Sequence, residues 1–279
     1  MIALPLSLLL HLAATGELVV LTQGSVAQYA QVVEGIKAVR GEIHEIDVGK
    51  PDELAAAVAA KPDAVIAVGS KAFELAREKV TTAPVIAAAV LRPSRSGHDN
   101  VTAVPMESRG AELAQATRML LPASKKVLAL HPGADDEGLA DVKSAAAASG
   151  FTLEVRVVGE LSGFQETFRA AVPGHEAVWI LADPRVAKPE IVKFMVATCV
   201  EQNIALFGFL EGMTKAGALA SVAADYVAIG REAAGFASEL AGKKKVPFRF
   251  AAGKVSVNER TRSALSLGTA LPPGAQLIR

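Results

Sequence analysis

The residues of this chain that could carry out chemistry are few and scattered. Its five histidines, at positions 11, 44, 98, 131 and 175, have no metal-ligand spacing, so no metal site is predicted. The single cysteine, Cys199, lies in the apolar run 191–200, where a buried side chain is favoured over a nucleophile. No phosphate-binding loop, dinucleotide-binding turn or nucleophile elbow occurs. The sequence therefore predicts no catalytic residue, no cofactor and no enzyme.

Short loops that follow apolar β-rich runs are the better candidates for a functional site. In parallel α/β sheets, ligands bind beyond the carboxyl ends of the strands, where helix N-termini also present unpaired N–H groups. This rule predicts small-molecule contacts at Gln23, Gly24, Ser25, Gly69, Ser70, Val90 and Leu91 in the first half of the chain, and at His131, Asp183, Phe209 and Glu211 in the second half.

Each candidate also has a purely structural explanation. Ser25 and Ser70 suit helix N-caps, and the glycines before them suit tight turns. Asp183 precedes a proline and suits a cap, Phe209 suits the core, and His131 suits a hydrogen-bonded structural role. The group of loops is therefore a firmer prediction than any single member.

Alternation of short β-rich runs with helical stretches predicts βαβ units that hold these loops. Strands are expected at 17–22, 42–47, 64–68 and 84–89 in a first series, and at 126–131, 152–158, 177–182 and 204–207 in a second. Helices are expected from Ser25 to a stop at Gly41, at 52–60 and at 70–79. The fold class is therefore α/β, with two doubly wound parallel-sheet lobes.

The segment 216–279 is too short for a third domain and must complete the first two. It contains an expected strand at 218–222, a helix capped by Asp225 and ended by Gly242, a strand at 254–257 and a helix from Asn258.

Composition argues against a polyanionic partner. Lysine plus arginine and aspartate plus glutamate each number 29 among 279 residues, so the formal charge is zero and nucleic acid is not expected. The basic run 243–245 follows a helix-ending glycine and is expected to face solvent.

Residues 1–16 are predicted to be a signal peptide. Their apolar block is too short to span a membrane, and Ala14-Thr15-Gly16 offers small residues at a cleavage position. No lysine or arginine precedes the block, and no lipid-accepting cysteine follows it. We expect export without stable membrane insertion.

The stretch from Glu211 to Asn258 carries a family resemblance. Its segments EGMTKAGALAS at 211–221, Asp225-Tyr226, Gly230-Arg231 and Val257-Asn258 resemble the ABC transporter substrate-binding family of tryptophan and tyrosine uptake. The resemblance implies a type I periplasmic-binding-protein fold, with a multi-strand hinge that closes over a ligand.

The same resemblance implies the lobe boundaries and the partners. Lobe 1 would comprise 17–105 plus 224–250, and lobe 2 would comprise 106–223 plus 251–279. The protein would work as a periplasmic or otherwise extracytoplasmic monomer that delivers a small molecule to an ABC permease.

Departures from the family pattern bear on the ligand. Where relatives often have polar residues, this chain has Gly69-Ser70, Leu91-Arg92-Pro93, Asp183-Pro184 and Phe209. A lost hydrogen-bonding partner in a closed site costs about 1–3 kcal/mol. The expected ligand is therefore an amino acid or a less polar metabolite. Asp183 could meet an ammonium group, whereas Arg92 is expected to lie outside the site.

Two other classes compete. Repressors of the lactose type share the bilobed fold but carry an N-terminal helix-turn-helix, which is not expected here because the first strand begins at Glu17. A degenerate binding-protein fold that acts as an envelope interaction or structural component, or as a ligand sensor without transport, stays open.

Overall fold

A computed structural model describes residues 17–279 except 96, 132, 134–136, 160 and 241–245. The chain forms two compact units. Unit 1 contains the chain up to Val90, Ser94–Val104 and Gly230–Pro247; unit 2 contains Leu91–Pro93, Pro105–Ile229 and Phe248–Arg279. The predicted signal peptide, the predicted stop at Gly242 and the basic run 243–245 lie outside the described residues. The lobe ranges implied by the resemblance stay predictions.

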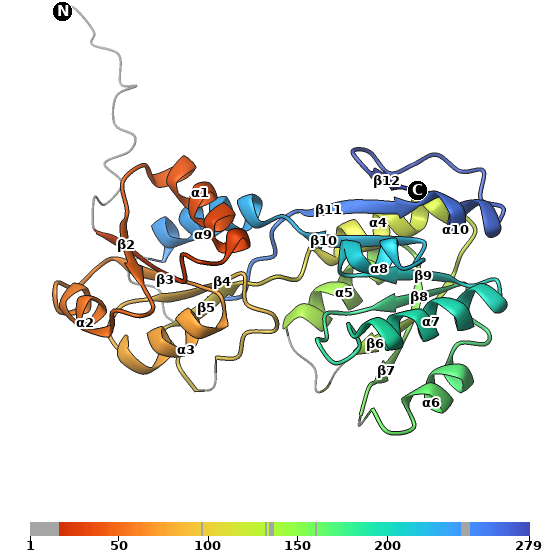
Figure 1. Cartoon of the computed structure of the whole chain (residues 1–279), viewed down its shortest axis with the longest axis horizontal. Helices are drawn as coiled ribbons and strands as arrows, with labels where there is room; N and C mark the ends of the chain where they lie inside the picture. Colours follow the sequence, from red (N-terminus) through yellow and green to blue (C-terminus); the bar gives the residue numbers. More distant parts are fainter. Residues whose placement is uncertain (1–16, 96, 132, 134–136, 160, 241–245) are drawn as a thin grey trace, which may run out of the picture. The chain divides into compact units, whose positions relative to one another are not determined.

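Unit 1 is built on a five-stranded parallel sheet (Figure 1). Its strand order is β2-β1-β3-β4-β5, with β1 (Leu18–Thr22), β2 (His44–Asp47), β3 (Ala64–Val68), β4 (Val85–Ala88) and β5 (Val101–Val104). Every residue of β1, β3, β4 and β5 is buried, as expected for parallel strands covered by helices on both faces.

The helices of unit 1 are α1 (Ala27–Arg40), α2 (Pro51–Ala59), α3 (Ser70–Lys79) and the part of α9 (Tyr226–Glu239) from Gly230 onward. The last helix packs against α1 at very close range, because a Cβ at Gly230 would overlap the carbonyl oxygen of Val32. Only glycine permits this approach. The C-terminal part of the sequence therefore completes the fold begun by the N-terminal part.

Unit 2 is built on a seven-stranded sheet with the order β12-β11-β10-β9-β8-β6-β7. Its strands are β6 (Lys126–His131), β7 (Thr152–Val157), β8 (Ala177–Ile180), β9 (Ala205–Gly208), β10 (Ala220–Ala224), β11 (Gly253–Asn258) and β12 (Gln276–Ile278). All pairs are parallel except β10–β11, which is antiparallel. The expectation of a parallel sheet thus holds for the β6–β10 part.

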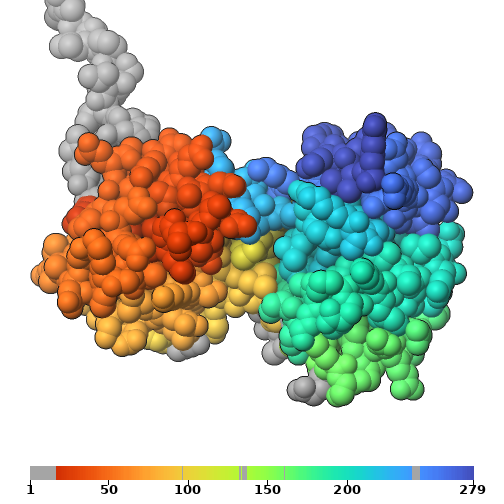
Figure 2. Space-filling model, viewed as in Figure 1, coloured from red at the N-terminus to blue at the C-terminus, as the bar shows by residue number. Residues whose placement is uncertain are grey.

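Two hydrophobic cores cover the two faces of this sheet. Side chains alternate along β6, so that Val127 and Ala129 join the core around Trp179, while Leu128 and Leu130 join the core around Phe168. The covering helices are α4 (Gly110–Leu120), α5 (Glu137–Ala148), α6 (Phe164–Ala171), α7 (Pro189–Glu201), α8 (Glu211–Lys215) and α10 (Glu259–Ala264). In Figure 2 the outer surface of unit 2 includes α6, which is coloured green.

The stretch Glu211–Asn258 contains a buried polar cluster. The Thr214 hydroxyl donates to the Ser221 hydroxyl at 2.7 Å and accepts a hydrogen bond from the Ser256 hydroxyl at 2.9 Å. The Asn258 side-chain amide donates to the Thr214 carbonyl at 2.8 Å, and its oxygen caps α10 by accepting from Thr261 N. This cluster joins α8 to the antiparallel pair β10–β11, so these residues build the fold of unit 2.

Most predicted elements are present within a few residues. The strands at 64–68 and 126–131 and the helix at 70–79 match the structure at both ends. The predicted cap at Asp225, the predicted helix start at Asn258 and the stop at Gly41 are also confirmed, with Asn258 as the N-cap residue of α10. Strands β5 and β12 were not predicted as strands.

The predicted Ser25 and Ser70 caps are wrong. Val26 and Gly69 occupy the N-cap positions of α1 and α3, and neither helix has a side-chain cap. Helix α3 begins one residue earlier than a Ser70 cap would require, because Gly69, at φ +84°, makes the turn itself.

The predicted burial of Cys199 is confirmed. Its side chain is 1% exposed, and burial raises the pKa of its thiol to about 12. Among the described residues, no group of three or more histidine, cysteine, aspartate or glutamate side chains could hold a metal ion. No helix in that part of the chain is long and apolar enough to cross a membrane.

Candidate ligand-binding site

The predicted loops of unit 1 gather at one edge of its sheet. Strands β1, β3 and β4 are neighbours and run parallel, so their carboxyl ends place Gln23 to Ser25, Gly69 with Ser70, and Val90 at the same edge. Among these residues Gly69 and Val90 are buried, whereas Gly24, Ser25 and Ser70 are exposed or partly exposed.

Asp47, at the end of β2, positions the first of these loops. Its carboxylate accepts hydrogen bonds from Gly49 N at 2.8 Å and Gly24 N at 3.3 Å. These backbone donors lower the pKa of Asp47, the Gly49 contact most strongly. The loop after β1 is therefore tied to the loop after β2 by an ionised side chain.

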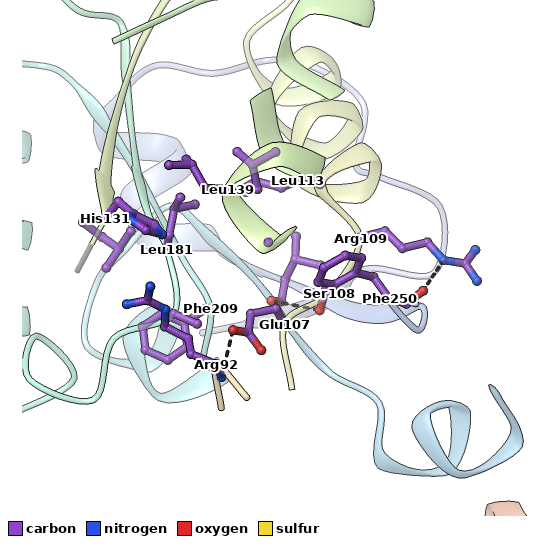
Figure 3. Close-up of a pocket in the computed structure, with 16 residues that line it drawn as sticks. Arg92, Glu107, Ser108, Arg109, Leu113, His131, Leu139, Leu181, Phe209 and Phe250 are labelled. Atoms are coloured by element: carbon purple, nitrogen blue, oxygen red, sulfur yellow. Dashed lines mark hydrogen bonds between the residues drawn. The ribbon is translucent and has the colours of Figure 1, made fainter. Parts of the chain in front are cut away.

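Unit 2 contains a pocket at the carboxyl edge of its own sheet (Figure 3). The pocket encloses about 560 Å³, including its open mouth. Its apolar walls come from α4, α5, the ends of β8, β9 and β10, and the segment before β11. These wall residues are Leu113, Leu139, Val142, Ile180, Leu181, Ala182, Phe209, Val222 and Phe250.

The polar groups of this pocket come mainly from the segments that lead into α4. Glu107 accepts a hydrogen bond from Arg92 N at 3.0 Å, and Arg109 Nε donates to the Phe250 carbonyl at 2.7 Å (Figure 3). His131 also lines the pocket, and its Nδ1 donates to the Gly133 carbonyl at 2.9 Å. Charged groups thus border a largely apolar space, an arrangement common in small-molecule sites.

Of the four site residues predicted at the ends of β6, β8 and β9, two line the pocket and two do not. His131 and Phe209 line the pocket, whereas Asp183 and Glu211 are not among its lining residues. Asp183 is 2% exposed and bound to Arg185, and Glu211 pairs with Lys215 at 2.5 Å. Leu91 belongs to unit 2 with Arg92.

Several lining residues were missed from the sequence. Arg92 was expected outside the site but lines the pocket. Glu107 and Arg109 follow β5, which was not predicted as a strand, and Phe250 precedes β11. Recognising β5 would have drawn attention to the residues after it, because loops that follow the carboxyl ends of parallel strands are candidate ligand contacts.

The hydroxyl chemistry of the pocket is limited. Among the described residues that line it, Ser108 alone carries a hydroxyl, and that hydroxyl donates to the Val222 carbonyl at 3.4 Å. A nucleophilic serine needs instead to donate to a general base such as a histidine. The pocket is therefore better suited to binding than to acyl-transfer catalysis.

Comparison of the sequence with protein families matches residues 44–267 to a family described as ABC transporter substrate binding protein. A comparison with curated proteins gives no match.

Solved structures resemble the whole fold. A ligand-free, open substrate-binding protein with adhesive properties from Clostridium difficile has a TM-score of 0.66 at 15% identity, with 95% of this chain and 99% of that chain covered. An ABC domain from Streptococcus pneumoniae in complex with L-Trp has a TM-score of 0.57 at 20% identity, with 94% and 99% covered. At these identities the likeness supports the fold, a two-unit α/β architecture of the type I periplasmic binding kind.

Proposed function

The chain belongs to the ABC transporter substrate-binding protein family, and from this we propose that it is the extracytoplasmic solute receptor of an ABC importer. The family is one of substrate-binding proteins rather than enzymes. The observation that carries the proposal is the pocket of unit 2, which lies at the carboxyl edge of a parallel sheet and combines apolar walls with a few polar groups.

The predicted loops of unit 1 supply the remaining contacts in this proposal. They follow three adjacent parallel strands, which is the position that ligands occupy in such sheets. We propose that hinge closure captures the solute, that residues 1–16 direct export, and that an ABC permease accepts the cargo. Asp183 and Glu211 stay predicted site residues.

An amino acid or a less polar metabolite is the proposed cargo. The structure from Streptococcus pneumoniae holds L-Trp, which makes aromatic amino acids the first ligands to test. The apolar walls around Leu139, Phe209 and Phe250 suit a side chain of this kind.

A thermal-shift screen tests the proposal. The chain lacking residues 1–16 is heated with amino acids, purines, sugars and apolar carboxylates, because a ligand that binds only the folded state stabilises it by about 2.7 kcal/mol at one hundred times its Kd. We expect at least one compound to raise the melting temperature. If no compound in a broad screen does so, the receptor proposal fails and an envelope interaction role is favoured.

A pair of variants locates the binding. Phe209 and Leu161 are both partly buried and pack against the same core, but only Phe209 lines the pocket. Phe209→Ala should weaken the binding of the ligand found in the screen at least tenfold, whereas Leu161→Ala should leave the Kd unchanged. Equal Kd values for the two variants would exclude the pocket as the binding site.

A further inference from the structure

The last strand of the unit 2 sheet offers an interaction surface. Strand β7 pairs with β6 on one side, and its other side is an edge of the sheet (Figure 1). We propose that two copies of this protein associate through that edge, with β7 of one copy pairing antiparallel to β7 of the other about a two-fold axis at Val155. Residues 152–157 do not line the pocket, so this surface is separate from ligand capture.

Backbone groups of β7 face outward at alternate residues. Thr152 N donates to the Lys125 carbonyl at 2.7 Å, and Val158 N donates to the His131 carbonyl at 2.7 Å. Because successive residues of a strand direct their N–H and C=O groups to opposite sides, the groups of residues 153, 155 and 157 point away from β6. Within the part of the chain that the structure describes, no other strand pairs with them. They form a template for a further strand.

Strand β7 is also the longest edge strand of the described residues. The unit 1 sheet ends at β2 and β5, with four residues each, whereas the unit 2 sheet ends at β12, with three residues, and at β7, with six. Short edge strands, proline and lysine are common protections against pairing with another chain. Strand β7 is of full length and contains neither proline nor lysine.

The sequence of β7 is self-complementary in the antiparallel direction. With Val155 opposite its own counterpart, Leu153 faces Val157 of the second copy, and these odd-numbered residues occupy the hydrogen-bonded positions. Glu154 then faces Arg156 of the second copy at a non-hydrogen-bonded position, where Cβ atoms lie about 4.5–5.5 Å apart. The two-fold axis repeats this pair, so two opposite-charge pairs flank Val155.

The apolar side chains of the strand suit this register. Val157 is 59% exposed, the highest fraction among the exposed large hydrophobic residues of the described chain. Leu153 and Val155 are partly buried and pack against the core around Trp179. Pairing in this register places Val157 beside Leu153 of the second copy and thereby extends that core across the axis.

Glu154 and Arg156 can each accept a second partner. Within the chain Arg156 Nε donates to Glu154 Oε1 at 2.7 Å, and His175 Nε2 lies 3.4 Å from Glu154 Oε2. The Arg156 and Glu154 side chains are nevertheless 59% and 43% exposed. The hydrogen bond from Arg156 lowers the pKa of Glu154, so both groups are charged at neutral pH. An exposed pair of this kind can add an opposite charge across the axis without losing its own partner.

Sedimentation equilibrium of the chain lacking residues 1–16 tests the proposal. We expect a monomer–dimer equilibrium with a micromolar Kd, because one strand pair buries less surface than a standard interface. A monomer at every concentration up to the millimolar range overturns the proposal. Because the measurement uses no solute, its failure is distinct from failure of the receptor function, which the thermal-shift screen reports.

Charge-reversed variants test the register. Glu154→Arg or Arg156→Glu alone places like charges opposite each other, so each variant should dimerise at least tenfold more weakly than the natural chain. The double variant Glu154→Arg/Arg156→Glu restores opposite charges and should dimerise as the natural chain does. Glu166→Arg, at an exposed position of α6, is the matched control and should leave the Kd of the dimer unchanged.

A mixture of the two single variants separates pairing between copies from pairing within one copy. The chain with two cations at positions 154 and 156 is opposite in charge to the chain with two anions there, so the mixed pair should associate although neither variant does so alone. A tag on one of them shows whether it retains the other. Undiminished dimers of both single variants, or the absence of a mixed dimer, overturn the proposed interface. Melting curves establish that each variant is folded.

Discussion

The aromatic ring of Tyr29 lies directly against the backbone of Gly69. A Cβ at Gly69 would overlap Cζ and the hydroxyl oxygen of that ring, and the backbone of Gly69 is left-handed, with φ +84°. Gly69 precedes α3 at the carboxyl edge of the unit 1 sheet. The packing of α1 over β3 therefore requires glycine for two separate reasons, one conformational and one steric.

Gly69→Ala should destabilise unit 1 by about 2–5 kcal/mol, because the cost of a left-handed backbone at alanine adds to the cost of an overpacked contact with Tyr29. Gly97→Ala is the matched control, because Gly97 has φ +82° but a Cβ added there would meet open space. That control should cost only about 1–2 kcal/mol. Urea unfolding measures both changes.

A second variant separates the two causes. Adding Tyr29→Ala to Gly69→Ala removes the ring, so the double variant should recover stability relative to the sum of the two single changes. If the two changes are additive, the ring contact does not constrain Gly69.

Thr214→Val should cost about 1–3 kcal/mol of unfolding free energy. The change keeps the shape of the side chain but leaves the buried Ser221 and Ser256 hydroxyls without their shared partner. Thr167→Val, at an exposed position of α6, should change stability by less than about 0.5 kcal/mol. Denaturant unfolding followed by fluorescence of Trp179, the only tryptophan, measures both. A neutral Thr214→Val would mean that the cluster contributes no net stability.

Glu112→Gln should stabilise the protein at neutral pH. Burial raises the pKa of Glu112 above its ordinary value of 4.5, although the Gly253 N–H donor and Arg109 oppose the shift. A raised folded-state pKa means that the carboxyl contributes stability below pH 4.5 and that this contribution is lost as the pH rises through the folded-state pKa. The amide of glutamine carries no such charge.

Melting curves across the range of about pH 4 to 7 measure this effect. The advantage of Glu112→Gln over the natural chain should be largest at the neutral end, should shrink as the pH falls through the folded-state pKa of Glu112, and should be lost below pH 4.5. Glu166→Gln, at an exposed position of α6, should give curves parallel to those of the natural chain. An advantage that does not vary with pH would show that the titration of Glu112 is not its cause.

The departures from prediction have local causes. Ser25 and Ser70 satisfied the residue preference for N-caps, but the preference does not specify which residue of a loop becomes the cap. Asp225 was predicted correctly, because its side chain does accept hydrogen bonds from the first helical turn. Asn258 was predicted only as the start of a helix, and its side chain caps that helix by accepting from Thr261 N. A residue preference alone therefore places a cap only to within about one residue, because the exact start of the helix depends on the backbone of the preceding loop.

The candidate site was predicted in outline. The sequence placed His131 and Phe209 at the carboxyl edge of a parallel sheet, and both line the pocket of unit 2. It missed the lining residues Glu107 and Arg109, since the strand before them was not recognised, and it placed Arg92 outside the site. Loop positions follow from strand order, but the direction of a side chain depends on neighbours that are far away in the sequence.

The sequence by itself determined the alternation of strands and helices and the α/β class, because these follow from apolar periodicity and turn residues within short segments. It also carried the family resemblance in Glu211–Asn258. Only the tertiary structure decided that Thr214 binds Ser256, that Tyr29 covers Gly69, and that Arg92 and Phe250 share one pocket. Such contacts join segments separated by tens of residues, and their geometry depends on how the sheets and helices pack.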